Sequence, residues 1–433
     1  MTQLTEPVYY HQGELQMESS QIRTLAGKMA TPFYCYSEAR LLGNVRRCKD
    51  AFESRGIQIH YAMKANSTLH ILRLIAEQGL GVDLVSGGEM QRALAAGFPA
   101  SRMIFSGVGK SRAELNAAIE AGVGRLEGNQ TESSQFNVES AEELALLAEL
   151  AEQQNARVSV ALRVNPDVSV NTHKNITTGQ KGNKFGIDME RVCELCQHYA
   201  DHSHLAIEGL AMHIGSQICD TEPYRAAIGK MMALVDQLAQ EGVEITRLDL
   251  GGGFGISYGQ GDALDFETIA EVIAAETERF HGTVIVEPGR SLVADTGILV
   301  SRINYVKAAE PRSFVILDAG MNDLMRPALY QAVHPIVTVN EAANGTAQEY
   351  DIVGPICEST DTFARSYPLS GDLQAGDLVA FLCAGAYCSV MNSTYNSRTI
   401  IPEVMVSGSE AKVIRQPVNQ QTLMAFEQDM PAL

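Results

Sequence analysis

The sequence predicts a (β/α)8 barrel followed by an all-β domain of sandwich or Greek-key type. From about residue 37 to 290, short β-rich segments alternate with longer segments whose apolar residues recur with helical spacing. Alternating strands and helices imply a parallel sheet. Eight such units over about 250 residues match the barrel in number and length. After residue 290, β-like segments follow one another with turns between them, which is typical of a separate β domain.

The elements of the barrel are expected in order along residues 36–290. The expected strands cover residues 57–63, 81–85, 103–106, 136–138, 158–164, 207–213, 245–250 and 283–287. The expected helices cover residues 69–78, 89–96, 112–121, 141–153, 223–240 and 266–280. Typical N-cap residues precede several helices, namely Ser67 or Thr68, Ser111, Ser140 and Asp265.

The second domain is expected to comprise residues 1–35 plus 291–433. Its β-like segments cover residues 298–306, 313–318, 332–339, 349–353, 378–383 and 401–407. Residues 8–10 and 33–36 are also β-like, so the N-terminal segment is expected to join this domain. The polar segment 125–135 indicates a surface insertion before the fourth barrel strand.

Composition excludes several classes of function. The formal net charge of −19 disfavours nucleic acid or an anionic membrane as a partner. No apolar segment approaches 18 residues, and residues 1–13 lack the apolar region of a signal peptide. We therefore expect a cytoplasmic protein whose eight cysteines are reduced. Cys193 and Cys196 form a single CxxC in a helical pattern, so no metal site is expected.

Chemically distinctive residues recur where the predicted strands end, and active sites of such barrels form at those ends. Lys64 follows the first strand, Asp83 lies on the second, and Arg163 ends the fifth. His213 ends the sixth strand and Glu287 the eighth. Loss of hydration lowers the pKa of an amine and makes it a nucleophile toward an aldehyde. Lys64 taken alone is also compatible with a strand-end lysine that reaches solvent, and His213 with a core histidine.

Glycines also gather at these ends. The seventh strand ends in Asp249-Leu250-Gly251-Gly252-Gly253, and Gly289-Arg290 follows the eighth. Glycine lets backbone N–H groups approach a phosphate closely, although the same triplet is compatible with a flexible turn. With Ser216, these residues are the components for holding pyridoxal 5′-phosphate: an amine, a phosphate cradle, a ring for the pyridine face and a carboxylate for its nitrogen.

Long motifs carry a family resemblance. YAMKAN, HIGSQ, LDLGGGFG and EPGR resemble the alanine-racemase-like, fold-type III decarboxylases that use pyridoxal phosphate. RVNPDV, TGQKGNKFGID, DAGMNDLMRPALY, GPICESTD and GAYCSVMNSTYNSR resemble the diaminopimelate decarboxylase family in particular. The motifs occur in the expected order over about residues 30 to 410. Cys388 departs from the pattern, because a small or aromatic residue is expected after Tyr387.

The resemblance implies roles for individual residues. Lys64 would form the Schiff base, His213 would stack on the pyridine ring, and Glu287 would pair with its nitrogen. The residues around the phosphate would be Ser216, Gly252, Gly253, Gly289, Arg290 and Tyr387. Asp83 and Arg163 would support the cofactor and its lysine. The substrate contacts would come from Arg290, Arg326, Tyr330, Glu358 and Tyr387, and Cys357 would donate a proton.

The resemblance also implies a homodimer, since Cys357 and Glu358 of such proteins belong to the neighbouring subunit's site. Residue type alone favours a surface ion pair for Arg326 and a buried inert thiol for Cys357. A bidentate arginine fork suits a carboxylate, and Arg326 and Tyr330 share a face if their segment is helical.

The implied reaction is decarboxylation of meso-2,6-diaminopimelate to L-lysine and CO2, the last step of lysine biosynthesis. Three alternatives stay open. One is decarboxylation of another basic amino acid or of a polyamine precursor such as carboxynorspermidine. The second is a racemase, which would need a tyrosine opposite the lysine. The third is a non-catalytic regulator of the same fold, although such relatives tend to lose the lysine or the cysteine that is present here.

Overall fold

The computed structural model describes residues 4, 6–126, 134–168, 184–259, 261–341 and 347–428. The chain divides into two compact units. One comprises Asn44–Ile256 and Asp262–Ser291, and is called the barrel unit. The other comprises Met1–Gly43, Ser257–Gly261 and Leu292–Leu433, and is called the β unit.

Eight parallel strands of the barrel unit form a closed ring, which confirms the predicted (β/α)8 barrel. The strand order is β5-β6-β7-β8-β9-β11-β12-β13, with β13 paired to β5 and β8 to β9. The strands are β5 Ile57–Ala62, β6 Gly81–Leu84, β7 Met103–Phe105, β8 Gln135–Val138, β9 Val158–Asn165, β11 Leu205–Ala211, β12 Arg247–Asp249 and β13 Thr283–Val286. The short strand β10 (Ile187–Asp188) pairs with β9 outside the ring.

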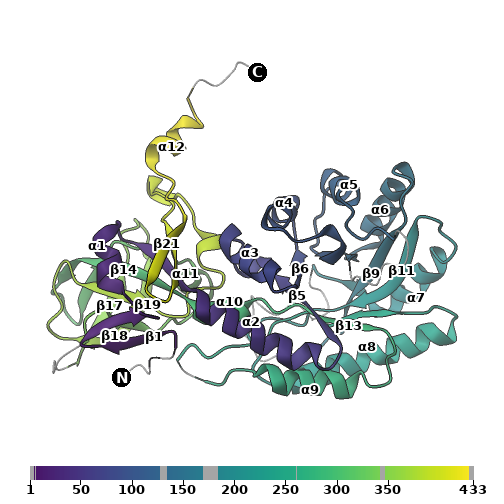
Figure 1. Ribbon diagram of the computed structural model, residues 1–433, viewed down its shortest axis with the longest axis horizontal. Helices are drawn as coiled ribbons and strands as arrows, with labels where there is room; N and C mark the ends of the chain where they lie inside the picture. The colour runs from purple at the N-terminus through teal and green to yellow at the C-terminus, as the bar shows by residue number, and fades with distance from the viewer. Residues whose placement is uncertain are drawn as a thin grey trace. The chain divides into compact units, whose positions relative to one another are not determined.

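Helices follow the strands and lie around the outside of the ring (Figure 1). They are α3 Leu69–Glu77, α4 Gly87–Ala96, α5 Arg112–Ala121, α6 Ala141–Gln153, α7 Met189–His198, α8 Glu222–Gln240 and α9 Phe266–Glu276. Ser111, Ser140 and Asp265 cap α5, α6 and α9 through their side chains as predicted. Thr68 occupies the N-cap position of α3 without a side-chain cap. Helix α2 (Glu38–Glu53), which the sequence analysis did not specify, contains the boundary between the units.

The β unit is built on a mixed sheet with the strand order β18-β17-β15-β14-β4-β20-β21, and β19 pairs with both β14 and β16. Its strands are β4 Phe33–Ser37, β14 Gly297–Lys307, β15 Ser313–Leu317, β16 Ile336–Thr338, β17 Ala347–Val353, β18 Thr362–Ser370, β19 Leu378–Phe381, β20 Glu403–Ser407 and β21 Glu410–Arg415. Helices α10 (Arg290–Val293), α11 (Arg326–Tyr330) and α12 (Gln420–Ala425) are short. Helix α10 begins at the end of the barrel unit.

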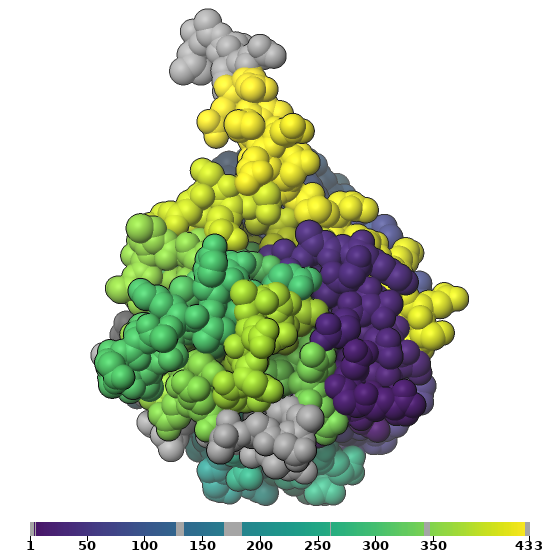
Figure 2. Space-filling model, turned by 90° about the vertical axis from the view of Figure 1, so that its left-hand side faces the viewer, coloured from purple at the N-terminus to yellow at the C-terminus, as the bar shows by residue number. Residues whose placement is uncertain are grey.

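The N-terminal segment joins this β unit, as predicted. Strand β4 lies between β14, to which it is antiparallel, and β20, to which it is parallel. Three further strands form a separate small sheet, namely β1 Val8–His11, β2 Glu14–Met17 and β3 Ser20–Gln21, and helix α1 (Ile22–Lys28) follows them. Figure 2 shows the purple N-terminal segment against the green segments of the same unit.

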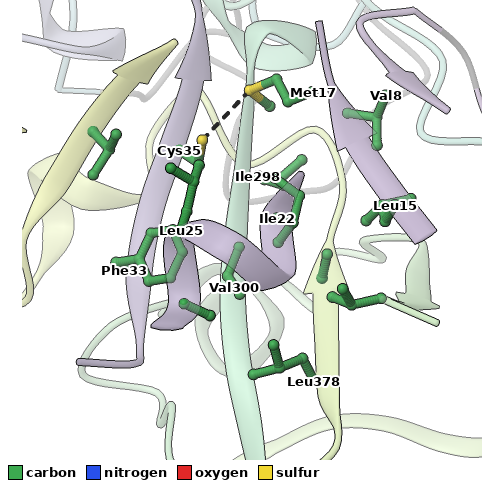
Figure 3. Packing of buried hydrophobic residues seen from close by; sticks show 14 of the residues in the cluster. Val8, Leu15, Met17, Ile22, Leu25, Phe33, Cys35, Ile298, Val300 and Leu378 are labelled. Carbon is green, nitrogen blue, oxygen red and sulfur yellow. Dashed lines mark hydrogen bonds between the residues drawn. The ribbon is translucent and has the colours of Figure 1, made fainter. Parts of the chain in front are cut away.

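A buried apolar cluster holds the N-terminal segment in place. Leu15, Ile22 and Phe33 from this segment pack with Ile298 and Leu378 from later strands (Figure 3). All five side chains are at most 5% exposed. Burial of this size stabilises by about 1.5–3 kcal/mol for each large aliphatic side chain. Segments more than 260 residues apart in the chain therefore share one core.

Four strands of the β unit were missing from the sequence prediction: β2 and β3 of the small N-terminal sheet, and β18 and β21 of the large sheet. Strands β18 and β21 lie at the two ends of the large sheet's order. Edge strands carry polar residues, which removes the alternating apolar pattern that identifies a strand. Most of the predicted insertion at 125–135 lies outside the described residues. Across the described ranges, no helix combines the length and apolar character needed to cross a membrane.

Candidate active site

Lys64 lies immediately beyond strand β5, in a 3-10 turn over Met63–Ala65. Its Nζ is 2.8 Å from Oδ2 of Asp83, which lies on the neighbouring strand β6. The Asp83 side chain is fully buried, whereas that of Lys64 is 35% exposed. The parallel pairing of Ala62 with Asp83 sets this contact. The amine is therefore positioned at the strand ends and remains open to solvent on one side.

Glu287 follows strand β13, and its side chain is hydrogen-bonded to Asp249 at the end of β12. Both carboxyl groups are buried. Burial raises the pKa of Glu287 well above its ordinary value, and the charges of Asp249 and Asp83 act in the same direction. Two adjacent buried carboxylates cannot both ionise at low cost. The Glu287 carboxyl therefore holds a proton in the cofactor-free protein.

Asp249 is the member of the pair that is better prepared to carry charge. Burial raises its pKa as well, but hydrogen bonds from Asn137 and Gly251 oppose that shift. The Asn137 amide donates to Oδ2 at 2.9 Å, and the Gly251 N–H donates to Oδ1 at 3.0 Å. Asn137 itself lies on β8 and accepts a hydrogen bond of 2.8 Å from Gln135. This buried polar chain links β8, β12 and the end of β13.

The roles of Asp249 and Asn137 were not predicted from the sequence. Asp249 ends a predicted strand next to three glycines, so its position was visible in the sequence. Asn137 lies on strand β8, whose sequence QFNV contains no local signal for the role of this residue.

The glycine segment after β12 packs against neighbouring backbone with no room for side chains. A Cβ on Gly252 would lie 1.9 Å from the Glu287 carbonyl oxygen, and one on Gly253 would lie 2.1 Å from the Gly215 carbonyl oxygen. Gly253 also has a φ of 95°, which favours glycine. The buried Tyr224 hydroxyl donates to the Gly252 carbonyl at 2.9 Å. The segment is thus a rigid cradle of backbone groups.

Two further residues adjoin this cradle. Nη2 of Arg290 donates to Oγ of Ser216 at 3.1 Å, which joins the segment after β11 to the start of α10. A Cβ on Gly289 would lie 3.1 Å from Ala62, so this glycine permits close packing next to β5. A guanidinium, a hydroxyl and backbone N–H groups together form a donor set suited to a phosphate.

His213 is half-buried beyond the end of β11. Burial lowers its pKa well below the ordinary value, and the cations of Lys64 and Arg163 act in the same direction. Nδ1 accepts the N–H of Gly252 at 3.4 Å, which leaves the ring proton on Nε2. His213 therefore presents a neutral ring, which suits stacking rather than acid catalysis.

Arg163, on β9, is held by an ion pair with Glu139, which follows β8. The other Glu139 oxygen accepts the Gly186 N–H at 2.8 Å, and the Arg163 guanidinium lies 4.9 Å from the centroid of the Phe185 ring. The charge and plane of this guanidinium are fixed by neighbouring residues.

Arg326, Tyr330, Cys357, Glu358 and Tyr387 belong to the β unit. Arg326 and Tyr330 begin and end α11, so the expected helical spacing is present. Arg326 is 6% exposed, which excludes the surface ion pair considered from its residue type. Tyr387 has a φ of 56°, an unusual backbone conformation for a residue with a side chain.

Cys357 and Glu358 are exposed between strands β17 and β18. The Asn396 side chain accepts the backbone N–H of Cys357 at 2.9 Å. The Tyr395 hydroxyl donates to Glu358. Exposure of Cys357 excludes the buried inert thiol that its residue type alone left open. All eight cysteines lie in the described part of the chain and are free thiols.

The fold and these residues define a class of protein. Residues 38–294 match the family model described as "Pyridoxal-dependent decarboxylase, pyridoxal binding domain". The chain is 41% identical to the diaminopimelate decarboxylase of Zymomonas mobilis, with 98% of each chain covered. It is also 41% identical to that of Pseudomonas aeruginosa, over 98% of this chain and 99% of the relative.

Solved structures agree with these relatives. Diaminopimelate decarboxylase from Helicobacter pylori complexed with L-lysine has a TM-score of 0.88 at 36% identity, covering 94% of this chain and 99% of that one. The enzyme from M. jannaschii in co-complex with L-lysine has a TM-score of 0.90 at 33% identity, covering 98% of both. The chain belongs to the diaminopimelate decarboxylase family.

The residues of the barrel unit fit pyridoxal phosphate. Among the described residues, Oε1 of Glu287 is buried without a hydrogen-bond partner, so this carboxyl group can pair with a ring nitrogen. The Gly252–Gly253 cradle excludes side chains from the position where a phosphate needs backbone donors. The Lys64 amine completes the set.

Proposed function

We propose that this protein is a carboxy-lyase that converts meso-2,6-diaminopimelate to L-lysine and CO2, the last step of lysine biosynthesis, with pyridoxal 5′-phosphate as cofactor. The observation that carries the proposal is the meeting of the Lys64 amine, the buried Glu287 carboxyl and the glycine cradle at the strand ends of one barrel. Lysine is the ligand named in structures of two relatives.

Lys64 would hold the cofactor covalently, and Asp83 would hold the amine in place. Pyridoxal phosphate supplies an aldehyde for amine exchange and a ring that accepts the electron pair released when a bond to Cα breaks. The Lys64–Asp83 contact of 2.8 Å supports the amine as an ammonium before the cofactor binds. Asp83 and the largely covered Arg163, whose side chain is 12% exposed, would then stabilise charge around the cofactor.

Glu287 would share its proton with the pyridine nitrogen. Its raised pKa, due first to burial, supports a carboxyl that keeps a proton within the pair formed with Asp249. A protonated ring nitrogen makes the cofactor an effective electron acceptor. His213 would cover one face of the ring, which fits a neutral imidazole. Ser216, Gly252, Gly253, Gly289, Arg290 and Tyr387 would surround the phosphate.

The substrate would be recognised through both of its amino acid ends. Arg290, Arg326 and Tyr330 would contact carboxylate, Glu358 would contact ammonium, and Tyr387 would adjoin the substrate. Arginine presents a planar fork that matches a carboxylate. A substrate without the distal carboxylate would leave a buried cation without a counter-charge, which costs several kcal/mol. Loss of CO2 from one end leaves an electron pair on Cα, and Cys357 would supply the proton that replaces the carboxylate.

We further propose a homodimer in which Cys357 and Glu358 complete the neighbouring subunit's site. Their exposure in the single chain supports this arrangement. Large side chains are also exposed nearby or toward the C-terminus: Tyr395, which contacts Glu358, is 47% exposed, Met424 51% and Phe426 73%. In Figure 2 the yellow segment with α12 stands out from the rest of the β unit. Exposed apolar residues of this kind mark protein interfaces.

We also propose that the protein works in the cytoplasm, a reducing compartment that suits its eight free thiols.

The proposed reaction is tested by incubating the protein with meso-diaminopimelate, with and without pyridoxal phosphate, and measuring lysine and CO2. Lysine and CO2 in equal amounts, dependent on the cofactor, would support the proposal. Carboxynorspermidine and L-lysine serve as competing substrates. Absence of lysine from the cofactor-loaded protein would defeat the substrate assignment, and a Lys64→Ala variant that still forms a borohydride-reducible adduct would defeat the assignment of the amine.

The shared site has its own test. Lys64→Ala and Cys357→Ala proteins, each inactive, are mixed under conditions that exchange subunits. If each site takes Lys64 from one chain and Cys357 from its partner, mixing restores up to about a quarter of the wild-type activity, because half of the dimers then hold one intact site. If mixing restores nothing although exchange is verified, each site is built from one chain.

A further inference from the structure

Arg326 is a buried cation whose immediate partners are neutral. Its side chain lies at the start of α11, and the residue is 6% exposed. Nη1 is 2.8 Å from Nε2 of His334, and the guanidinium carbon is 4.8 Å from the centroid of the Tyr258 ring. Within the described ranges, no carboxylate forms an ion pair with Arg326. A buried guanidinium held by neutral groups retains its charge for an anionic ligand.

The contacts of His334 determine its protonation state. Its Nδ1 is 3.0 Å from the Leu382 carbonyl oxygen, which can only accept a hydrogen bond. Its Nε2 faces Arg326, which can only donate. The ring proton therefore lies on Nδ1, and Nε2 offers its lone pair. Only the neutral imidazole satisfies both partners.

The sheet holds His334 firmly. Just beyond it, β16 pairs with β19, with Ile336 opposite Phe381, and the Leu382 N–H donates to the Pro335 carbonyl at 2.8 Å. His334 is 3% exposed. The Tyr258 ring lies edge-on to the imidazole, with centroids 5.5 Å apart. Helix α11 is only five residues long, so its arginine depends on contacts with the sheet for a fixed position.

We propose that His334 is a positioning residue that, as a neutral imidazole, aligns Arg326 for the distal carboxylate of the substrate. The inference rests on the proposed function, in which Arg326 binds that carboxylate. It adds a residue, outside the predicted site, that sets the site's specificity by acting through the arginine.

The arrangement has a consequence for pH dependence. Protonation of Nε2 would remove the acceptor for Arg326 and place two cations together, so Arg326 would lose its alignment at acid pH. The other ionisable groups of the surrounding elements are Tyr258, Tyr367, whose hydroxyl contacts Ile336, and Cys383 next to Leu382. Burial raises the pKa of Cys383 to about 12. That thiol is therefore neutral at the pH of the assay, and His334 is the residue whose protonation would break the contact with Arg326.

The test compares variants of the cofactor-loaded enzyme. His334→Phe keeps a ring but has no polar atom, His334→Gln keeps an acceptor and a donor, and Arg326→Gln removes the cation. The control His204→Phe removes a histidine whose Nδ1 also contacts a carbonyl oxygen, that of Ala156, at 3.0 Å in the barrel unit. Measurements are KM and kcat for meso-diaminopimelate from pH 5.5 to 8 and the visible absorbance of the bound cofactor.

We expect His334→Phe to raise KM about tenfold or more while kcat changes by less than about threefold, because substrate alignment is lost and the chemistry is retained. The cofactor absorbance should not change. His334→Gln should lie closer to wild type than His334→Phe, and its KM should lack the rise that wild type shows toward pH 5.5. Combining His334→Phe with Arg326→Gln should add little to the effect of Arg326→Gln alone.

Three outcomes would overturn the proposal: a KM for His334→Phe within twofold of wild type, full additivity with Arg326→Gln, or the same acid dependence of KM in His334→Gln and wild type. The last comparison decides the matter if His334→Phe does not fold. Failure of the proposed function gives a different result, because Arg326→Gln itself would then leave the KM for diaminopimelate unchanged.

Discussion

Gly252 offers a sharp test of the cradle, because its substitution by alanine has a purely steric effect. The added Cβ would lie 1.9 Å from the Glu287 carbonyl oxygen and 2.7 Å from its carbonyl carbon. Gly252 does not have the positive φ of its neighbours Gly251 and Gly253. Backbone strain is therefore not part of the expected effect, and the space available decides it.

The size of the effect follows from the contacts that resist movement. An ordinary contact begins at 3.4 Å, so the two backbone segments must separate by about 1.5 Å. The Glu287 N–H donates to the Gly251 carbonyl at 2.8 Å, and the Ala62 N–H donates to the Pro288 carbonyl at 3.1 Å. Overpacking of this kind costs about 1–3 kcal/mol of folding free energy. A displacement near 1 Å in a site costs about a hundredfold in function.

The assay measures two properties of the cofactor-free Gly252→Ala protein: its thermal unfolding and its affinity for pyridoxal phosphate, followed by visible absorbance. We expect a lower unfolding temperature and a cofactor Kd raised by between about tenfold and a hundredfold. The control is Gly229→Ala on the exposed face of α8, where an added Cβ meets no atom within 4 Å. That change should stabilise the protein by about 0.5–1 kcal/mol and leave the Kd unchanged. If Gly252→Ala binds the cofactor within twofold of wild type, the close approach of the backbone is not needed for binding.

Three further predictions concern buried charges. Lys110→Met should lower the free energy of unfolding by roughly 3–5 kcal/mol, because the fully buried Lys110 side chain is 2.7 Å from Glu143 and its loss leaves that carboxylate unpaired. The control is Arg112→Met, which removes the exposed ion pair with Glu149. Denaturant unfolding of this control should differ little from that of the wild type. Burial raises the pKa of Asp323 to about 7, whereas the same carboxyl in the unfolded chain ionises near pH 4. The free energy of unfolding of the wild type should therefore fall by up to about 4 kcal/mol as pH rises from about 4 to 7. Asp323→Asn should remove that slope, and an unchanged slope would contradict the assignment. The pKa of Glu287 is also raised by folding, so above about pH 4.5 the cofactor-free Glu287→Gln protein should gain stability relative to wild type, as measured by denaturant unfolding. The same variant should bind the cofactor more weakly, as measured by visible absorbance.

Much of the barrel was predictable because its signals are local. Helix α5 has the predicted bounds and the predicted cap at Ser111, since side-chain spacing and a capping residue act within a few positions. The residues at the strand ends were predictable for a related reason. A lysine or glutamate at the end of an apolar strand stands out from its neighbours, and parallel strands bring their carboxyl ends to the same side.

Other features depend on contacts between distant residues. Asn137 and Asp249 are 112 positions apart and share a 2.9 Å hydrogen bond across the barrel interior. Their residue types are equally compatible with a turn or a surface, so nothing local identifies the pair. Strands β18 and β21 were missed because edge strands lack the alternating pattern.

By itself, the sequence determined the class of fold, the position of Lys64 and Glu287 at strand ends and the glycine cradle. These features depend on the spacing of apolar residues and on the conformational freedom of glycine, which are properties of short segments. Only the tertiary structure decided that Glu287 lies against Asp249, that β4 lies between β14 and β20, and that His334 holds Arg326. The physical reason is that a hydrogen bond between side chains requires their atoms to lie within about 3 Å. That proximity is set by how whole strands and helices pack, not by the order of residues in any one segment.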